Sequence, residues 1–338
     1  MFLPCLHKIA AREDLSAAEA REAMLAILNG EVTTPQISAF LVGLRTKGET
    51  AEELLGFARA MREKSTRIDV GLVAEPLLDT CGTGGDGGAT FNISTVAAFV
   101  VAGAGVRVAK HGNRSFSSQC GSADILEHLG VQVSFTPERA GQAIREIGIG
   151  FLFAPLMHPA MKHAQPARAE LKMRTVFNML GPLTNPARAT RQLIGAPSAQ
   201  AAELMACALA GLEIERAFIV HGSDGLDEVT TTGSTLVFEV AGASVRSFEW
   251  APEGFGIAPA NIEELRGGDR ACNSAIATAI LQGKRGAQRD IVLVNSAAAL
   301  LVGGAARDAQ EAMERAEKSI DSGAAWAKLR QLAEFSRG

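Results

Sequence analysis

Residues 77–105 read LLDTCGTGGDGGATFNISTVAAFVVAGAG. The short run at 76–78 predicts a strand, the glycines of 82–88 predict a loop, and the apolar run at 96–104 predicts a helix entered through 92–95. Glycine lets the backbone approach a ligand closely, and the first amides of a helix have no partner within it and attract anions. The stretch therefore predicts an α/β fold with a diphosphate-binding loop, although a plain glycine-rich turn would have a similar sequence.

The spacing of these glycines matches neither of the two common nucleotide-binding loops. It differs from G-x-G-x-x-G, and no lysine follows the last glycine as it would in a P-loop. A lysine comes instead from KHGNRSFSS at 110–118, after a predicted strand at 106–109. Because the carboxyl ends of neighbouring parallel strands meet in one crevice, both loops are predicted to face one ligand.

The chain then continues to alternate predicted strands and helices, which is typical of a mainly parallel sheet covered by helices. The segment GPLTNP at 181–186 is predicted to be a rigid connection that returns to the sheet. We predict strands at 131–135, 150–153, 191–196 and 217–220, helices at 137–146 and 199–211, a hairpin of 235–240 with 244–250, and mostly helices over 261–337.

The N-terminal part has a helical pattern. Capping boxes at 16–19 and 50–53 start two predicted helices, and Thr34 followed by proline starts a third that ends at Gly48. We therefore predict a small all-helical N-terminal domain, residues 1–70, joined by helices from about 158–185. Residues 71–338 are predicted to form a large α/β domain with a mainly parallel central sheet.

The composition argues against several classes of protein. The 338 residues are 47% hydrophobic with a formal net charge of −4, and no apolar run is long enough to cross a bilayer. A slightly acidic chain offers no general attraction to nucleic acid or to anionic membranes. Five scattered cysteines argue against a disulfide framework and a structural zinc site. Residues 1–14 lack the pattern of a signal peptide, so we expect a cytoplasmic protein.

Two adjacent carboxylates, Asp227 and Glu228, follow the predicted strand at 217–220. Hard dications such as Mg²⁺ prefer oxygen ligands and keep waters and substrate phosphates in their shell. These residues predict a metal site beside the phosphate loop, with a solvated acidic turn as the alternative. By local sequence alone, His158 is interpreted as a hydrogen-bonded structural group and Arg168 as a solvated helix arginine.

Several blocks in one order carry a resemblance that covers nearly the whole chain. They are GTGGDG, NxST, KHGNRSxSSxxGSAD, HPAMK, RTxFNxLGPLxNPA and HGxDGLDE. In this order and at these spacings they resemble the anthranilate phosphoribosyltransferase family of tryptophan biosynthesis. One position departs from the family, because Lys172 stands where the family usually has glycine.

The resemblance implies transfer of the phosphoribosyl group of 5-phosphoribosyl 1-pyrophosphate (PRPP) to the amine of anthranilate, with release of pyrophosphate. It also implies up to two Mg²⁺ ions and a homodimer formed through the helical domain, with no nucleic-acid or membrane partner. Two alternatives remain. A pyrimidine nucleoside phosphorylase-like enzyme would have a different second loop, and a non-enzymatic nucleic-acid-binding relative would have a basic groove and degraded phosphate loops.

The resemblance also assigns residues to each ligand. It implies that PRPP is bound by Gly82, Gly85, Asp86, Thr90, Asn92, Ile93, Ser94, Thr95, Lys110, His111, Gly112, Asn113, Arg114, Ser115, Phe116, Ser117, Ser118 and Ser122. It implies that anthranilate is bound by Gly82, Asn113, His158 and Arg168, where a guanidinium fork suits the carboxylate. The implied metal ligands are Ser94, Asp227 and Glu228. No covalent nucleophile is assigned.

Overall fold

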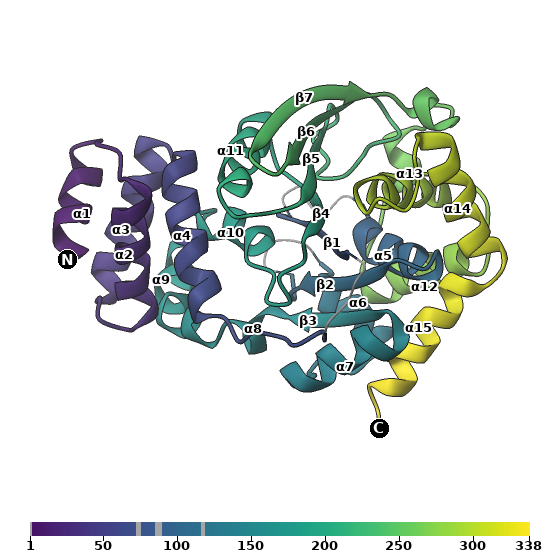
Figure 1. Cartoon of the computed structure of the whole chain (residues 1–338), viewed down its shortest axis with the longest axis horizontal. Coiled ribbons are helices and arrows are strands. Elements are labelled where there is room, and N and C mark those ends of the chain that lie inside the picture. The colour runs from purple at the N-terminus through teal and green to yellow at the C-terminus, as the bar shows by residue number, and fades with distance from the viewer. Residues whose placement is uncertain (1, 72–75, 85–89, 116–118) are drawn as a thin grey trace.

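The described residues form one seven-stranded sheet in the order β3-β2-β1-β4-β5-β6-β7 (Figure 1). The computed structural model describes residues 2–71, 76–84, 90–115 and 119–338. The first five strands run parallel, and the hairpin of β6 and β7 is antiparallel. The strands are β1 (Leu77–Gly82), β2 (Arg107–Gly112), β3 (Ile149–Phe153), β4 (Arg191–Gly195), β5 (Arg216–Gly222), β6 (Thr235–Ala241) and β7 (Ser244–Trp250).

The strand order creates a crevice beside β1. Strand β2 lies on one side of β1 and β4 lies on the other. The connection from β1 to β2 therefore runs toward one edge of the sheet, and the connection from β3 to β4 crosses back toward the other edge. Ligands bind in parallel α/β sheets at the carboxyl ends of the strands where the order reverses in this way. Thr83 and Gly84, the described residues of the predicted glycine loop beyond β1, follow the strand at this point of reversal.

Helices cover both faces of the sheet. Helix α5 (Ile93–Gly103) packs on β1 and β2, and α13 (Ala287–Val302) packs beside it on β4 and β5. Helix α11 (Ala199–Ala210) packs on β5 and β6 and also contacts α4 (Ala51–Lys64) of the N-terminal part. The other helices of the α/β part are α6 (Ser122–His128), α7 (Pro137–Ile147), α12 (Arg270–Leu281), α14 (Ala309–Asp321), α15 (Ala324–Phe335), η2 (Pro252–Phe255) and η3 (Ile262–Leu265).

The N-terminal part is helical, as predicted. Both predicted capping boxes form, since Ser16 and Thr50 accept from the amides of Glu19 and Glu53 at 3.3 and 3.2 Å. The N-cap of α3 is Thr33, one residue before the predicted Thr34. The helix that precedes these three was not predicted. The four helices are α1 (Phe2–Ala10), α2 (Ala17–Leu28), α3 (Thr34–Lys47) and α4.

Further helices from the middle of the chain pack on this unit. Helix α9 (Gln165–Leu171) contacts α3, the short helix η1 (Pro159–His163) contacts α2, and α10 (Phe177–Leu183) contacts α4. The buried side chains of α9 and α10 join the same hydrophobic cluster as those of α1 to α4, and the partly buried Ala160 and Met161 of η1 pack against it. The exact domain boundary at residue 70 stays a prediction. Helix α8 (Ala154–Met157) comes just before these helices, contacts β3 and η1, and places its buried Met157 in the other hydrophobic cluster, which contains α5 and α13.

Two predicted elements of the α/β part are wrong. Residues 131–135 do not form a strand, although Val131, Val133 and Phe135 alternate as buried residues with exposed neighbours. The alternation reflects packing against the core, while the amide of Gln132 donates to Ser336 Oγ at 2.9 Å and to no strand. The segment 181–186 is not wholly a connection, because its first three residues complete α10 with Pro182 inside the helix.

None of the helices in the part of the chain that the structure describes is long and apolar enough to cross a membrane.

Candidate active site

A cavity of about 330 Å³ opens at the carboxyl ends of β1 and β2. Residues from both predicted ligand loops line it, together with residues of α9 and α10 and of the loop after β5. Gly85, Asp86, Phe116, Ser117 and Ser118 lie outside the described residues. Of the other predicted site residues, the cavity brings together Gly82, Thr90, Asn92, Ile93, Ser94, Thr95, Lys110, His111, Gly112, Asn113, Arg114, Ser115, Ser122, Arg168, Asp227 and Glu228.

Helix α10 contributes a wall that the sequence analysis missed. Phe177, Asn178 and Pro182 line the cavity. Asn178 is held in place because its Oδ1 accepts from the amide of Thr175 at 2.9 Å. All of these belong to the block RTxFNxLGPLxNPA, which carried the resemblance but to which no binding residue was assigned.

Lys110 lies inside β2 and not in the loop after it, because the strand continues three residues beyond its predicted end. The side chain is buried, and its Nζ donates to the carbonyl of Thr80 at 2.6 Å and lies 3.4 Å from Ser94 Oγ. Burial lowers the pKa of Lys110, while the nearby carboxylate of Asp79 opposes this shift. A poorly hydrated ammonium at the edge of the cavity is suited to attract phosphate oxygens.

Asp79 balances this charge from within β1. It is buried, and it accepts from the amide of His111 at 3.1 Å and from Asn185 Nδ2 at 2.7 Å. Burial raises the pKa of Asp79, and the hydrogen bond from Asn185 and the charge of Lys110 oppose that rise. The buried lysine therefore has a fixed electrostatic partner behind the cavity.

The predicted metal ligands Asp227 and Glu228 lie in the loop after β5, where they contact the loop after β1 and the first turn of α5. Asp227 Oδ2 accepts from the amide of Gly84 at 2.8 Å, and Glu228 Oε1 accepts from the amide of Ser94 at 3.1 Å. Among the described residues no group of three or more His, Cys, Asp or Glu forms a metal cluster. Two carboxylates beside a predicted phosphate loop still fit Mg²⁺, which completes its shell with waters and substrate phosphates.

Two glycines are required for this close approach. A Cβ on Gly195, at the end of β4, would lie 1.6 Å from the carbonyl oxygen of Asp227. A Cβ on Gly82 would lie 2.5 Å from Asp227 Oδ2. The ends of β1 and β4 can therefore accommodate the acidic loop only because both residues lack a side chain.

Arg168 is half-buried on α9 and faces the cavity. Its Cζ lies 5.2 Å from the centroid of the Phe177 ring. It makes no ion pair with any carboxylate of the described residues. Burial lowers the pKa of Arg168. A guanidinium held against an aromatic ring without a carboxylate partner is suited to receive one from a ligand.

The departure at Lys172 has a structural consequence at the end of the same helix. Lys172 is the C-cap of α9 in the left-handed conformation, with φ 47° and ψ 35°. Its amide donates to the carbonyl of Arg168 at 3.3 Å. Glycine takes this conformation freely, whereas another residue loses about 1–2 kcal/mol. The usual glycine of the family therefore fits the geometry found here, and lysine adopts it at a cost.

His158 does not line the cavity. It is buried behind His111, which does line it, and the two ring centroids lie 5.1 Å apart. His111 Nδ1 lies 3.2 Å from the carbonyl oxygen of Gly181, while the Nε2 atoms of both rings have no hydrogen-bond partner among the described residues. Contact between His158 and anthranilate stays a prediction.

The histidine pair gives the stability of the protein a pH dependence. Burial, with repulsion from His158, lowers the pKa of His111 to about 3, and burial lowers that of His158 to about 4. The unfolded histidines, with a pKa of about 6.5, therefore bind protons before the folded ones do. We expect full stability above about pH 6.5 and a loss of up to about 1.4 kcal/mol per pH unit per histidine below it.

Urea unfolding at a series of pH values between about 7.5 and 5.5 tests this expectation. The variant His158→Asn should lose roughly half of the slope, since one of the two groups no longer titrates. A free energy of unfolding that is equal at both ends of the range would contradict the neutral, buried state of the pair.

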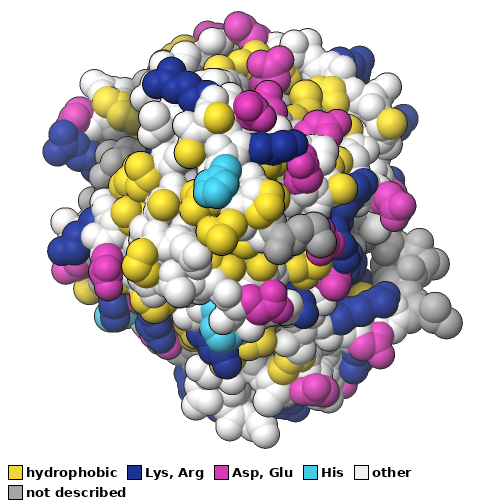
Figure 2. Space-filling model, turned by 90° about the vertical axis from the view of Figure 1, so that its left-hand side faces the viewer, with side chains coloured by type: hydrophobic (Ala, Val, Ile, Leu, Met, Phe, Trp, Pro, Cys, Tyr) yellow, Lys and Arg dark blue, Asp and Glu magenta, His cyan; other side chains and the backbone are white. Residues whose placement is uncertain are grey.

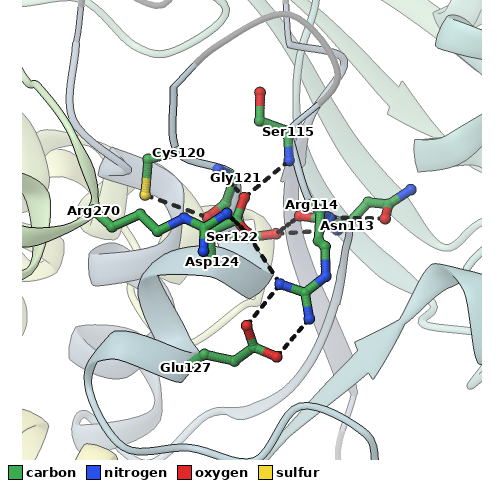
Figure 3. Close-up of polar contacts among 9 residues, drawn as sticks. All are labelled: Asn113, Arg114, Ser115, Cys120, Gly121, Ser122, Asp124, Glu127 and Arg270. Atoms are coloured by element: carbon green, nitrogen blue, oxygen red, sulfur yellow. Dashed lines mark hydrogen bonds and ion pairs between the residues drawn. The ribbon is translucent and has the colours of Figure 1, made fainter.

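Arg114 lines the cavity, but its guanidinium is engaged (Figure 3). Its two Nη atoms donate to Glu127 at 2.6 Å each, and Nη1 also donates to Asp124 at 3.1 Å. The side chain therefore braces the loop after β2 within the protein. Its predicted contact with PRPP would require these ion pairs to be shared or released.

The sequence matches family models for both parts of the molecule. Residues 3–65 match the helical bundle domain of a glycosyl transferase family, and residues 74–326 match its a/b domain. The anthranilate phosphoribosyltransferase of Solibacter usitatus is 59% identical over 335 residues, which is 99% of this chain and 98% of that protein.

Solved structures are similar to this chain over nearly its whole length. The crystal structure of anthranilate phosphoribosyltransferase from Thermus thermophilus is similar with a TM-score of 0.93 and 42% identity, covering 99% of each chain. The Saccharomyces cerevisiae protein in complex with PRPP and Mg has a TM-score of 0.90 at 28% identity, covering 99% of this chain and 98% of that one. The same yeast protein is also known in complex with 4-fluoroanthranilate. The chain described here therefore belongs to the anthranilate phosphoribosyltransferase family of glycosyl transferases.

Proposed function

We propose that this protein transfers the phosphoribosyl group of PRPP to the amine of anthranilate, giving N-(5-phosphoribosyl)anthranilate and pyrophosphate in tryptophan biosynthesis. One observation carries the proposal. A single cavity joins a buried lysine and an acidic pair, suited to a diphosphate with its metal, to Arg168 over an aromatic ring, suited to an aromatic carboxylate.

The reaction exchanges one bond at the anomeric carbon. The bond from this carbon to the pyrophosphate oxygen breaks, the bond from the anthranilate nitrogen forms, and the amine loses one proton. Pyrophosphate leaves readily once its charge is compensated, and an aromatic amine needs little activation. Catalysis should therefore rest on positioning and electrostatic stabilisation, and no covalent nucleophile is required.

Lys110 and the start of α5 lie on the proposed leaving-group side. The ammonium of Lys110 would compensate phosphate oxygens in a site of low polarity, where a charge acts more strongly than in water. Asp227, Glu228 and Ser94 would hold up to two Mg²⁺ ions, which supply charge neutralisation at the diphosphate. Arg168 and Asn113 would orient anthranilate so that its nitrogen faces the anomeric carbon.

A fluorescence assay tests the whole proposal. Anthranilate fluorescence should disappear only when PRPP and Mg²⁺ are both present, and removal of Mg²⁺ with a chelator should stop the reaction. A pyrimidine nucleoside phosphorylase-like enzyme would instead require inorganic phosphate and a nucleoside. Consumption of a nucleoside with phosphate, and none of anthranilate with PRPP, would overturn the proposal.

We further propose a cytoplasmic homodimer formed through the helical domain. Figure 2 shows the face of this domain, on which hydrophobic side chains gather. Leu3 of α1 and Val42 of α3 are exposed large apolar residues, at 49% and 38%, and an exposed apolar patch is typical of an interface. Analytical ultracentrifugation should give twice the chain mass of 35.4 kDa. A single species of one chain would contradict the proposal.

A further inference from the structure

Asp124 lies just behind the cavity wall, on the first turn of α6 (Figure 3). It is 3% exposed, and it is not among the residues that line the cavity. Its Oδ2 accepts from the amides of Gly121 at 2.9 Å and Ser115 at 3.2 Å. One carboxylate oxygen therefore ties together two points of the backbone that approach the cavity from different directions.

The other oxygen of this carboxylate receives two arginines. Oδ1 accepts from Arg114 Nη1 at 3.1 Å and from Arg270 Nη2 at 3.0 Å. Burial raises the pKa of Asp124, but the hydrogen bonds from the backbone and from Arg114 outweigh it and lower the pKa below its ordinary value. Asp124 is thus an ionised carboxylate that accepts from four N–H donors, and such charge-assisted hydrogen bonds hold their partners strongly and in fixed directions.

The backbone that this anchor holds belongs to the substrate cavity. Residues 113–115 and 120–122 all line it. On the far side of the anchor, Ser122 Oγ lies 3.2 Å from the amide and 3.1 Å from the carbonyl of Asn113. The positions of these cavity-lining groups therefore depend on a residue that itself lies outside the cavity.

The first turn of α12 reaches both ligand loops. Arg270 approaches Asp124, and three residues later Asn273 Nδ2 donates to Asn92 Oδ1 at 3.1 Å. Asn92 in turn donates to the carbonyl of Cys120 at 3.0 Å. Asn273 is buried and accepts from the amide of Gly268 at 2.8 Å. The same helix turn thus contacts Asn92 of the loop after β1 and, through Asp124 of α6, is connected to the loop after β2.

We propose that Asp124 is a positioning residue for PRPP binding, and that Arg270 of α12 supports it. The inference rests on the proposed function. Asp124 fixes the backbone on both flanks of the loop after β2 before the substrate arrives, so that less ordering is required on binding. Arg270, which is exposed and does not line the cavity, acts only through Asp124.

The test compares two neutralised carboxylates on the same helix. Asp124→Asn keeps the size of the side chain but cannot accept from four donors with a full charge. Glu127→Gln is the matched control, because Glu127 also pairs with Arg114 but its carboxylate accepts from no backbone amide among the described residues. We expect Asp124→Asn to raise the KM and the calorimetric Kd for PRPP about tenfold or more. Glu127→Gln should change them less than about twofold, since it breaks only an exposed pair.

The KM for anthranilate should change several-fold less than that for PRPP in Asp124→Asn, because Arg168 lies on a different element and only Asn113 of the proposed anthranilate contacts lies on the anchored backbone. A general loss of folding would instead lower the active fraction and leave the KM values alone. Arg270→Ala should raise the PRPP KM about threefold or more, and Arg270→Lys should restore part of the loss.

Arg270→Ala decides the matter if Asp124→Asn does not fold. An increase in the PRPP KM of less than about threefold in Arg270→Ala, or of less than about twofold in folded Asp124→Asn, overturns the inference. An inactive wild-type protein would overturn the proposed function instead, so the two failures are distinguishable.

Discussion

The double substitution Asp227→Asn/Glu228→Gln is expected to remove most of the Mg²⁺-dependent turnover and to leave the protein folded. Neutral amides bind a dication far less well than carboxylates do. The metal contributes several kcal/mol to charge stabilisation at the transition state, which corresponds to about two to three decades in kcat/KM. Folding should survive because each substituted side chain keeps a carbonyl oxygen that can accept from the backbone amides of Gly84 and Ser94.

The measurement is kcat/KM for PRPP over a titration of Mg²⁺, together with the thermal midpoint. Asp224→Asn is the matched control from the same loop. Asp224 bonds to Thr230 and Thr232 and does not line the cavity, so this variant should keep the wild-type Mg²⁺ dependence. An unchanged Mg²⁺ dependence in the double variant would refute the metal assignment.

Arg168→Ala is expected to raise the KM for anthranilate and also to lower kcat. The contact that we propose for Arg168 is a charged hydrogen bond that would fix the position of the amine. Its loss typically costs about 1.5–3 kcal/mol, or roughly one to two decades in kcat/KM. The KM for PRPP should change far less. Arg168→Lys should restore only part of the loss, because an ammonium cannot reproduce the planar fork.

Steady-state kinetics with each substrate varied in turn checks this result. Arg139→Ala is a suitable control, because Arg139 is another arginine held over a phenylalanine ring, with Cζ 3.9 Å from the Phe335 centroid, and it does not line the cavity. An anthranilate KM within about twofold of wild type in folded Arg168→Ala would move the carboxylate to another cation. Arg174 is the next candidate, although its Nη2 already lies 3.5 Å from the carbonyl oxygen of Thr83.

Local patterns predicted most of the secondary structure because their causes are local. The capping boxes at Ser16 and Thr50 need only residues within one helical turn, and both form. The hairpin of β6 and β7, two strands close together in the sequence, was also predicted. The prediction failed at residues 131–135, where alternating burial exists without a neighbouring strand, because pairing depends on which segments lie alongside.

In the candidate site, too, features with a local cause were predicted and features that depend on tertiary packing were not. The motifs identified the residues of both ligand loops and the acidic pair, because each motif is contiguous and its residue types suit a phosphate or a metal ion. They did not indicate that Lys110 is buried within a strand, or that His158 lies behind His111. Burial depends on elements that pack from elsewhere in the chain.

The sequence by itself determined the order of strand, glycine loop and helix, the family, and the residue types available for each ligand. Only the tertiary structure decided which charges are engaged within the protein. Arg114 is paired with Glu127, whereas Arg168 has no carboxylate partner among the described residues. Arg270 reaches Asp124 from a distant part of the chain. The physical reason is that a side chain's partners are set by packing between distant segments, and no local pattern records them.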